Sequence, residues 1–196
     1  MTEVNEGFRI LRVRVADQVA MPTIVVVTSA LRYDGATYVA CGLARACAEF
    51  EHRTLLIDAH GNEAGAIEFL RGTETPLLSV RGLFRESANE NVAVTLQKLR
   101  AEYDVVVVDA PPVPNSSLAL SLAGAADGVI FAVQFGRKQT PADEEMVSVL
   151  ADHRILGVVP NRASRPVAPV RGTQPLREAG GVEGLVSRLR AGKASN

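Results

Sequence analysis

Short apolar segments rich in β-branched residues recur through the first 160 residues, and they constrain the fold more than any other feature of the chain. Such runs are typical of strands that are buried on both faces of a parallel sheet. Between them lie segments with apolar residues at helical spacing, such as Val39, Leu43 and Cys47. Because alternating strands and helices specify this architecture, the sequence predicts an α/β fold with a mostly parallel sheet and helices on both faces.

The predicted strands are Thr23–Thr28, Thr54–Asp58, Tyr103–Asp109, Gly128–Phe135 and Arg154–Val159. The predicted helices are Thr2–Val15, Ala36–Glu51, Val92–Glu102, Leu118–Ala126, Pro141–His153 and a short one at Val182–Arg190. Ligands of such sheets bind beyond the carboxyl ends of the strands. The loops to inspect are therefore Thr28–Thr37, Asp58–Asn62, Asp109–Asn115 and Pro160–Arg162.

Composition narrows the class of protein further. Hydrophobic residues make up 47% of the chain, and 21 Lys and Arg against 22 Asp and Glu give a net charge of -1, which disfavours a nucleic-acid binder. No apolar run approaches the ~20 residues of a membrane span. We expect a soluble cytoplasmic protein that reaches the inner face of the membrane only through a partner. Cys41 and Cys47 lie in one apolar segment, which favours neither a disulfide nor a metal site.

The chain divides into two parts by composition. Residues 1–162 carry all the strand segments and form the predicted globular domain. Residues 163–196 contain scattered Pro, Gly and Arg and read as a basic tail with one short helix.

Six segments then occur in an order known from one family. They are EGFRILRVRV at 6–15, TSALRYDGATYVACGLA at 28–44, LLIDAH at 55–60, YDVVVVDAPPV at 103–113, AADGVIFAVQFG at 125–136 and LGVVPNR at 156–162. Together they resemble the cytoplasmic kinase domain of bacterial tyrosine kinases of capsular and exopolysaccharide synthesis, within the MinD/ParA class of P-loop ATPases. The resemblance implies a P-loop NTPase fold, with ATP and magnesium as ligands of a competent member.

The segment Arg32–Tyr38 stands where that family's phosphate loop reads Pro-Gly-Glu-Gly-Lys-Ser/Thr-Thr. A phosphate loop needs glycines to curl around the anion, a lysine for the β/γ phosphates and a hydroxyl for magnesium. Gly35 and Thr37 match, but Ala36 replaces the lysine and Tyr33 replaces a glycine. Losing a comparable electrostatic donor costs roughly 3–4 kcal/mol in a transition state. The nucleotide-binding positions implied by the resemblance are Asp34, Gly35, Ala36, Thr37 and Tyr38.

The sequence keeps some, but not all, of the aspartates in this family's pattern. The resemblance implies that Asp58 and Asp109 are the catalytic and magnesium-binding carboxylates, with Thr37 as a further magnesium ligand. His60 stands where relatives have a second aspartate, and it cannot offer a fixed negative charge beside a metal. Asn161 matches the residue that contacts adenine in relatives. Asp109 and Asn161 also suit simple turns after strands, so both interpretations stay open.

The N-terminal helix carries Glu6, Arg9 and Arg12, which reproduce the family's Glu-x-x-Arg-x-x-Arg pattern. In the family this helix joins kinase domains into a ring, so the resemblance implies a homo-oligomer; a solvated amphipathic helix is the alternative. Residues 163–196 contain no tyrosine, whereas relatives end in a tyrosine cluster that is their substrate.

The sequence therefore favours a catalytically impaired, kinase-like regulatory or scaffold component of exopolysaccharide or capsule synthesis and export. Its expected partners are a membrane adaptor of export or a competent kinase, with no nucleic acid and no cofactor, or ATP or ADP with magnesium if the loop retains nucleotide. The alternatives are an active kinase or ATPase with an atypical loop, and a MinD/ParA-like positioning protein with a membrane-targeting tail.

Overall fold

Six parallel strands form one sheet in the computed structural model, which describes residues 5–61, 63–79 and 91–161. The strand order is β3-β2-β4-β1-β5-β6, and every neighbouring pair is parallel. The strands are β1 (Thr23–Thr28), β2 (Thr54–Asp58), β3 (Leu77–Ser79), β4 (Val105–Asp109), β5 (Gly128–Gln134) and β6 (Ile155–Asn161). The helices are α1 (Glu6–Ala16), α2 (Ala36–Glu49), α3 (Glu63–Leu70), α5 (Val92–Leu99), α6 (Ser117–Ala125) and α7 (Pro141–Val149), with a short 3-10 turn η1 (Val113–Asn115).

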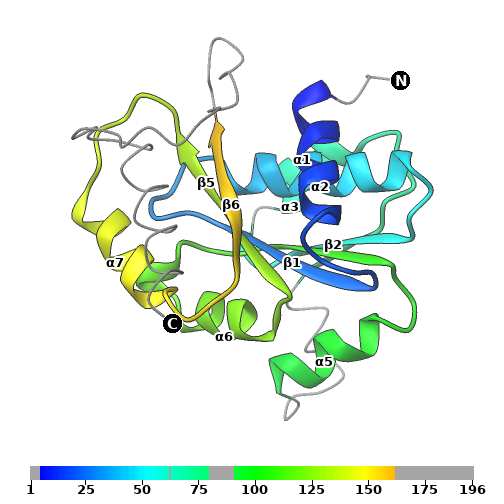
Figure 1. The fold of residues 1–196 in the computed structure, drawn as a ribbon. Helices are drawn as coiled ribbons and strands as arrows, with labels where there is room; N and C mark the ends of the chain where they lie inside the picture. The colour runs from blue at the N-terminus through cyan, green and yellow to red at the C-terminus, as the bar shows by residue number, and fades with distance from the viewer. Residues whose placement is uncertain (1–4, 62, 80–90, 162–196) are drawn as a thin grey trace.

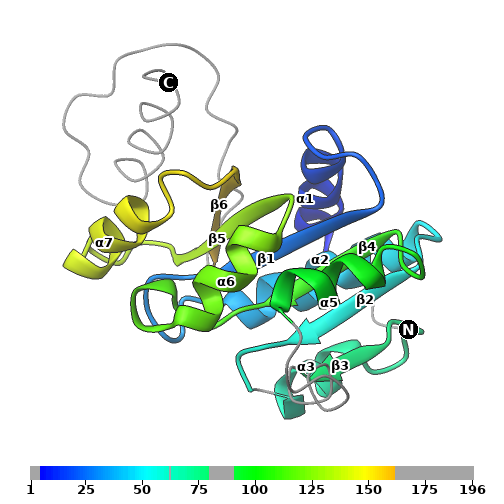
Figure 2. The ribbon, with the colours of Figure 1, turned by 90° about the horizontal axis from the view of Figure 1, so that it is seen from below.

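Helices cover both faces of the sheet, as the sequence predicts (Figures 1 and 2). One face packs against α1, α2 and α3 through a cluster that includes Val25, Leu43 and Leu70. The other face packs against α5, α6 and α7 through a cluster that includes Val26, Leu96 and Leu122. The residues of β1 and β4 are all buried, because alternate side chains of a central parallel strand enter two different cores.

The predicted elements agree with the structure except at short or peripheral ones. Strands β1 and β2 have the predicted bounds, and the other predicted elements within the described residues differ only at their ends. The sequence analysis did not predict α3 or β3, which contain only eight and three residues. The predicted helix at 182–190, the tail of residues 163–196 and Arg162 lie outside the described residues.

The sheet brings the loops named above to one edge. Asp58 ends β2 and Asp109 ends β4, and the register pairs these two residues directly across neighbouring strands. Helix α2 begins at Ala36, just beyond the end of β1. Both cysteines are free and buried, in agreement with the prediction. None of the helices that the structure describes is both long and apolar enough to span a bilayer.

Candidate functional site

The loop between β1 and α2, where the resemblance places a phosphate loop, contains two residues with left-handed backbone conformations. Gly35 lies immediately before α2 with φ of 99°, in the left-handed region that favours glycine. Tyr33 also has a positive φ, 71°, and its side chain is 81% exposed. The position where relatives carry a glycine thus keeps the glycine conformation with a tyrosine in it. Ala36, at the lysine position, is buried and offers no cation.

Asn161 lies against this loop from the end of β6. Its Nδ2 donates to the backbone oxygen of Asp34 at 3.1 Å. A Cβ atom added to Gly35 would lie 1.7 Å from the same Nδ2, so a larger residue would have to displace the Asn161 side chain as well as adopt a left-handed φ. In this structure the amide of Asn161 contacts the loop backbone, as a turn-stabilising residue does, and the adenine contact that the resemblance implies stays a prediction.

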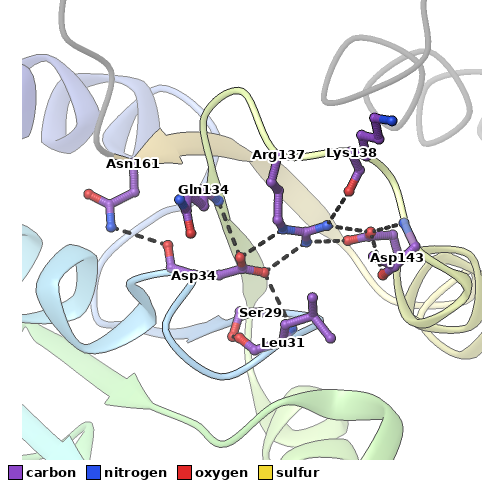
Figure 3. Close-up of polar contacts among 9 residues, drawn as sticks. Ser29, Leu31, Asp34, Gln134, Arg137, Lys138, Asp143 and Asn161 are labelled. Carbon is purple, nitrogen blue, oxygen red and sulfur yellow. Dashed lines mark hydrogen bonds and ion pairs between the residues drawn. The ribbon is translucent and has the colours of Figure 1, made fainter.

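A buried ion-pair network holds the loop from the other side (Figure 3). Asp34 is 2% exposed, and Arg137, just after β5, donates to it through Nε and Nη2, each at 2.8 Å. The same guanidinium donates to both oxygens of Asp143 in α7, at 2.5 and 2.6 Å. Bidentate guanidinium–carboxylate pairs are among the stronger ion pairs, because two parallel hydrogen bonds add to the charge attraction.

The same contacts set the ionisation of the network. Burial alone would raise the pKa of Asp143, but Arg137 together with the N–H and hydroxyl of Thr140 lowers it below its usual range. Asp143 is also the third residue of α7, and the capping box it forms with Thr140 fixes its position. The hydrogen bond with Asp143, and next the one with Asp34, raises the pKa of Arg137, so the guanidinium stays charged.

The two strand-end carboxylates beside this network have no cation. Asp58 and Asp109 are 2% and 1% exposed, and their Cα atoms are register partners. Oδ1 of Asp58 accepts from the backbone N–H groups of His60 and Gly61 at 2.9 and 2.8 Å, as a turn-forming aspartate does. Within the described residues, Oδ2 of Asp58 and both oxygens of Asp109 have no hydrogen-bond partner.

This burial changes the acid–base properties of Asp109 and of a nearby cysteine. Burial raises the pKa of Asp109 to about 7; the charge of Asp58 adds to the rise, and the nearby Thr37 side chain opposes it. Cys41 lies within reach of the same two charges, and burial, followed by Asp109 and Asp58, raises the pKa of its thiol to about 12. The thiol is therefore protonated at neutral pH and is not a nucleophile.

The donors present fit magnesium only if phosphate oxygens complete its coordination. Buried, unpartnered carboxylate oxygens and a threonine hydroxyl are hard donors of the kind that magnesium takes. Among the described residues, however, no cluster of three or more His, Cys, Asp or Glu side chains is placed to hold a metal ion. The loop lacks a lysine, since Ala36 stands at that position, whereas Asp34 stands where the family's pattern has Glu and so keeps the acidic character of that position.

The N-terminal residues singled out by the sequence contact their own chain. Arg9 donates through Nε to Glu49 of α2 at 3.2 Å and lies 3.6 Å from Glu6. The guanidinium of Arg12 lies over the ring of Phe50, with its carbon 3.6 Å from the ring centroid. Both arginines thus help to dock α1 on α2, whereas Glu6 keeps 73% of its side chain exposed.

The structure brings the predicted site residues of the loop and of the two strand ends together at one edge of the sheet. Glu6, Arg9 and Arg12 lie away from this edge, on α1. Sequence reasoning missed Arg137 and Asp143. The one available signal was the helix start at Thr140-Pro141, which marks Asp143 as a capping residue. Nothing in the sequence connects either residue to Asp34, about a hundred positions earlier.

Comparison with known proteins gives structural relatives only. No family model and no curated protein sequence matches the chain. The kinase domain of the Escherichia coli tyrosine kinase ETK aligns over 84% of this chain and 79% of its own, with a TM-score of 0.62 and 20% identity. The VpsO kinase domain aligns over 82% of this chain and 92% of its own, with a TM-score of 0.59 and 25% identity.

A third similar structure is cobyrinic acid a,c-diamide synthase from Mycobacterium smegmatis, with bound ADP and magnesium. It aligns over 70% of this chain and 73% of its own, with a TM-score of 0.56 and 18% identity. These likenesses confirm the predicted fold, a P-loop NTPase-like α/β sheet of the kind found in bacterial tyrosine kinase domains.

Proposed function

We propose that this protein is a kinase-like domain that does not transfer phosphate and that serves as a regulatory or scaffold component of exopolysaccharide or capsule synthesis and export. The observation that carries the proposal is the composition of the phosphate loop. Ala36 stands at the lysine position, and the loop is held by Asp34 and Arg137 within the chain. Without a lysine, the charge that builds up on a transferring phosphoryl group lacks a main protein partner.

Thermal unfolding with ATP and magnesium tests this proposal. A ligand at a hundredfold over its Kd would stabilise the fold by about 2.7 kcal/mol, so a binding-competent loop gives a clear rise in Tm. We expect no magnesium-dependent rise with the wild type. The matched gain-of-function variant is Ala36→Lys with Tyr33→Gly, which restores the lysine and the glycine. A clear magnesium-dependent rise with the unaltered protein would overturn the proposal.

One observation favours a second candidate, an active kinase or ATPase with an atypical loop. Asp58 and Asp109 remain paired across β2 and β4, with carboxylate oxygens unpartnered in the described part of the chain. Retained activity would use these oxygens on magnesium and would be abolished by Asp58→Asn. Phosphate release from ATP by the wild type, absent in Asp58→Asn, would favour this candidate over the first.

Assembly is the part of the proposed scaffold role that the resemblance assigns to α1. The resemblance assigns this role to Glu6, Arg9 and Arg12, and the exposed apolar residues Ile10 and Val13 lie on the same helix. Ile10 and Val13 are 54% and 46% exposed and lie one turn apart on the outer side of α1.

Light scattering tests the assembly role with two variants. Ile10→Glu with Val13→Glu should convert oligomers into monomers, because charges buried at an interface cost several kcal/mol. The control, Val94→Glu, places a charge at a similarly exposed apolar position on α5 and should leave the mass unchanged. A monomeric wild type at high concentration, alone and with its adaptor, would show that the assembly role is wrong.

A further inference from the structure

Asp34 has the surroundings of a bound anion. Its carboxylate accepts from the backbone N–H of Leu31 at 3.3 Å and from that of Gln134 at 3.4 Å. The bidentate guanidinium of Arg137 supplies two further donors at 2.8 Å (Figure 3). Backbone N–H groups and a cation around one buried anion are the kinds of donor found in anion-binding sites, and here they come from residues outside positions 34–38.

The cation of this set is itself immobilised. Arg137 is only 14% exposed, and Asp143 engages the opposite side of its guanidinium. Asp143 accepts in addition from the N–H and hydroxyl of Thr140, at 2.7 and 2.9 Å. Arg137 therefore cannot swing towards a ligand without leaving two buried carboxylates unpaired.

The charge of the network also opposes a second anion. Asp34, Asp143 and one guanidinium sum to a single negative charge in a buried setting, where charges are screened far less than in water. Asn161 adds a contact on the remaining side, through its bond to the Asp34 carbonyl over Gly35. The loop is thus held by two side chains of the protein itself, Arg137 after β5 and Asn161 at the end of β6.

We propose that Asp34 is the internal anion of this loop: its carboxylate takes the donors of Leu31, Gln134 and Arg137 and holds the loop closed without any phosphate ligand. This inference deepens the proposed function and rests on it. A loop that is held by the protein's own side chains explains how the domain stays folded without nucleotide. The ion pairs of Arg137 with Asp34 and with Asp143 also connect the loop to α7.

Chemical rescue tests the internal anion. In Asp34→Ala the carboxylate is removed and a space of formate size faces the same donors. We expect the Tm of Asp34→Ala to be lower than that of the wild type. Sodium formate should raise this Tm saturably and recover at least half of the loss. Sodium chloride at equal ionic strength should not. The control is Asp104→Ala, which removes the partner of Arg53 from an exposed pair; formate should not rescue it beyond chloride.

Two results would overturn the inference: Asp34→Ala with the Tm of the wild type, or Asp34→Ala whose loss formate and chloride affect equally. If Asp34→Ala does not fold, Asp34→Asn keeps the shape and removes the charge. Hydrogen exchange at the amides of Leu31 and Gln134 should then be at least tenfold faster, with the α5 amides unchanged. Unchanged exchange at both loop amides would equally overturn the inference.

Inorganic phosphate is a second probe and separates this inference from the proposed function. Phosphate should raise the Tm of Asp34→Ala more than that of the wild type at equal ionic strength. If phosphate raises the two Tm values equally, the inference that Asp34 is the internal anion is wrong. Binding of ATP with magnesium by the wild type would overturn the proposed function, whereas the formate result decides the role of Asp34 whichever way the nucleotide titration falls.

Discussion

The carboxyl edge of the sheet holds two pairs of equally buried aspartates, and their surroundings are opposite. Asp34 and Asp143 share the guanidinium of Arg137. Asp58 and Asp109 face each other from β2 and β4, and no cation within the described residues pairs with them. Each of the four side chains is 1% or 2% exposed, so burial does not distinguish the pairs.

This difference separates two parts of an NTPase-like site. In the β1–β5 half, where the resemblance places phosphate, Arg137 pairs with both buried carboxylates. The β2–β4 half, where the resemblance places magnesium, keeps acidic groups whose charge is uncompensated. Buried carboxylates without a partner are costly, and strongly shifted groups cluster at functional sites. The comparison therefore predicts that the first half stabilises the fold and that the second half destabilises it at neutral and higher pH.

Removing the shared cation should have the largest effect. Arg137→Ala leaves Asp34 and Asp143 buried without a cation, and breaking a buried ion pair in this way typically costs about 3–5 kcal/mol. Urea denaturation at neutral pH measures the free energy of unfolding. The matched control is Arg53→Ala, which breaks an exposed pair with Asp104 and should cost far less, because solvent screens the charges of exposed pairs. Equal losses in the two variants would mean that the network around Arg137 contributes little.

Asp109→Asn should stabilise the protein in a pH-dependent way. Because the pKa of Asp109 is raised to about 7, the folded state binds more protons than the unfolded state between about pH 4 and pH 7. Stability of the wild type therefore falls as the pH rises through this range, by up to about 4 kcal/mol. The variant lacks this loss, so it should exceed the wild type at pH 8 and match it near pH 4.

Denaturant unfolding at pH 4 and pH 8 checks the sign of this prediction. The control is Asp104→Asn at the opposite edge of the sheet, where hydrogen bonds from Arg53 lower the pKa of the carboxyl. That group stabilises the fold above its unfolded pKa, and the contribution disappears in acid, so this variant should be weaker than the wild type at pH 8. A gain in Asp109→Asn that is the same at both pH values would contradict the assignment.

Tyr33→Gly should have the smallest effect. A left-handed conformation costs a residue with a Cβ atom about 1–2 kcal/mol, and the added freedom of glycine in the unfolded chain offsets part of the relief. We expect a net gain of roughly 0.5–1 kcal/mol on these grounds, measured as a rise in Tm. Tyr33→Ala removes the same ring but keeps the Cβ atom, and it should give no gain. Equal gains in both variants would point to the ring and not to the backbone.

Much of the fold could be predicted because its central strands are buried on both sides. The apolar runs of β1 and β4 mark strands wherever they occur, and Asp58 and Asp109 follow from their places at strand ends. Helix α3 and strand β3 were missed because eight and three residues carry too little periodic signal. The tertiary structure also turned Arg9 and Arg12 towards α2 of the same chain, a contact that the spacing of residues within α1 does not encode.

The sequence by itself determined the alternation of strands and helices, the absent lysine at Ala36 and the acidic strand ends, because each of these is a local property of the chain. Only the tertiary structure decided that Asp34 is paired with a cation and that Asp109, within the described residues, is not. Arg137 lies 103 positions from Asp34 in the chain and meets it because β1 and β5 are neighbours in the sheet. Whether a buried carboxylate meets a cation depends on which loops the strand order brings together, and local patterns of residues do not contain that order.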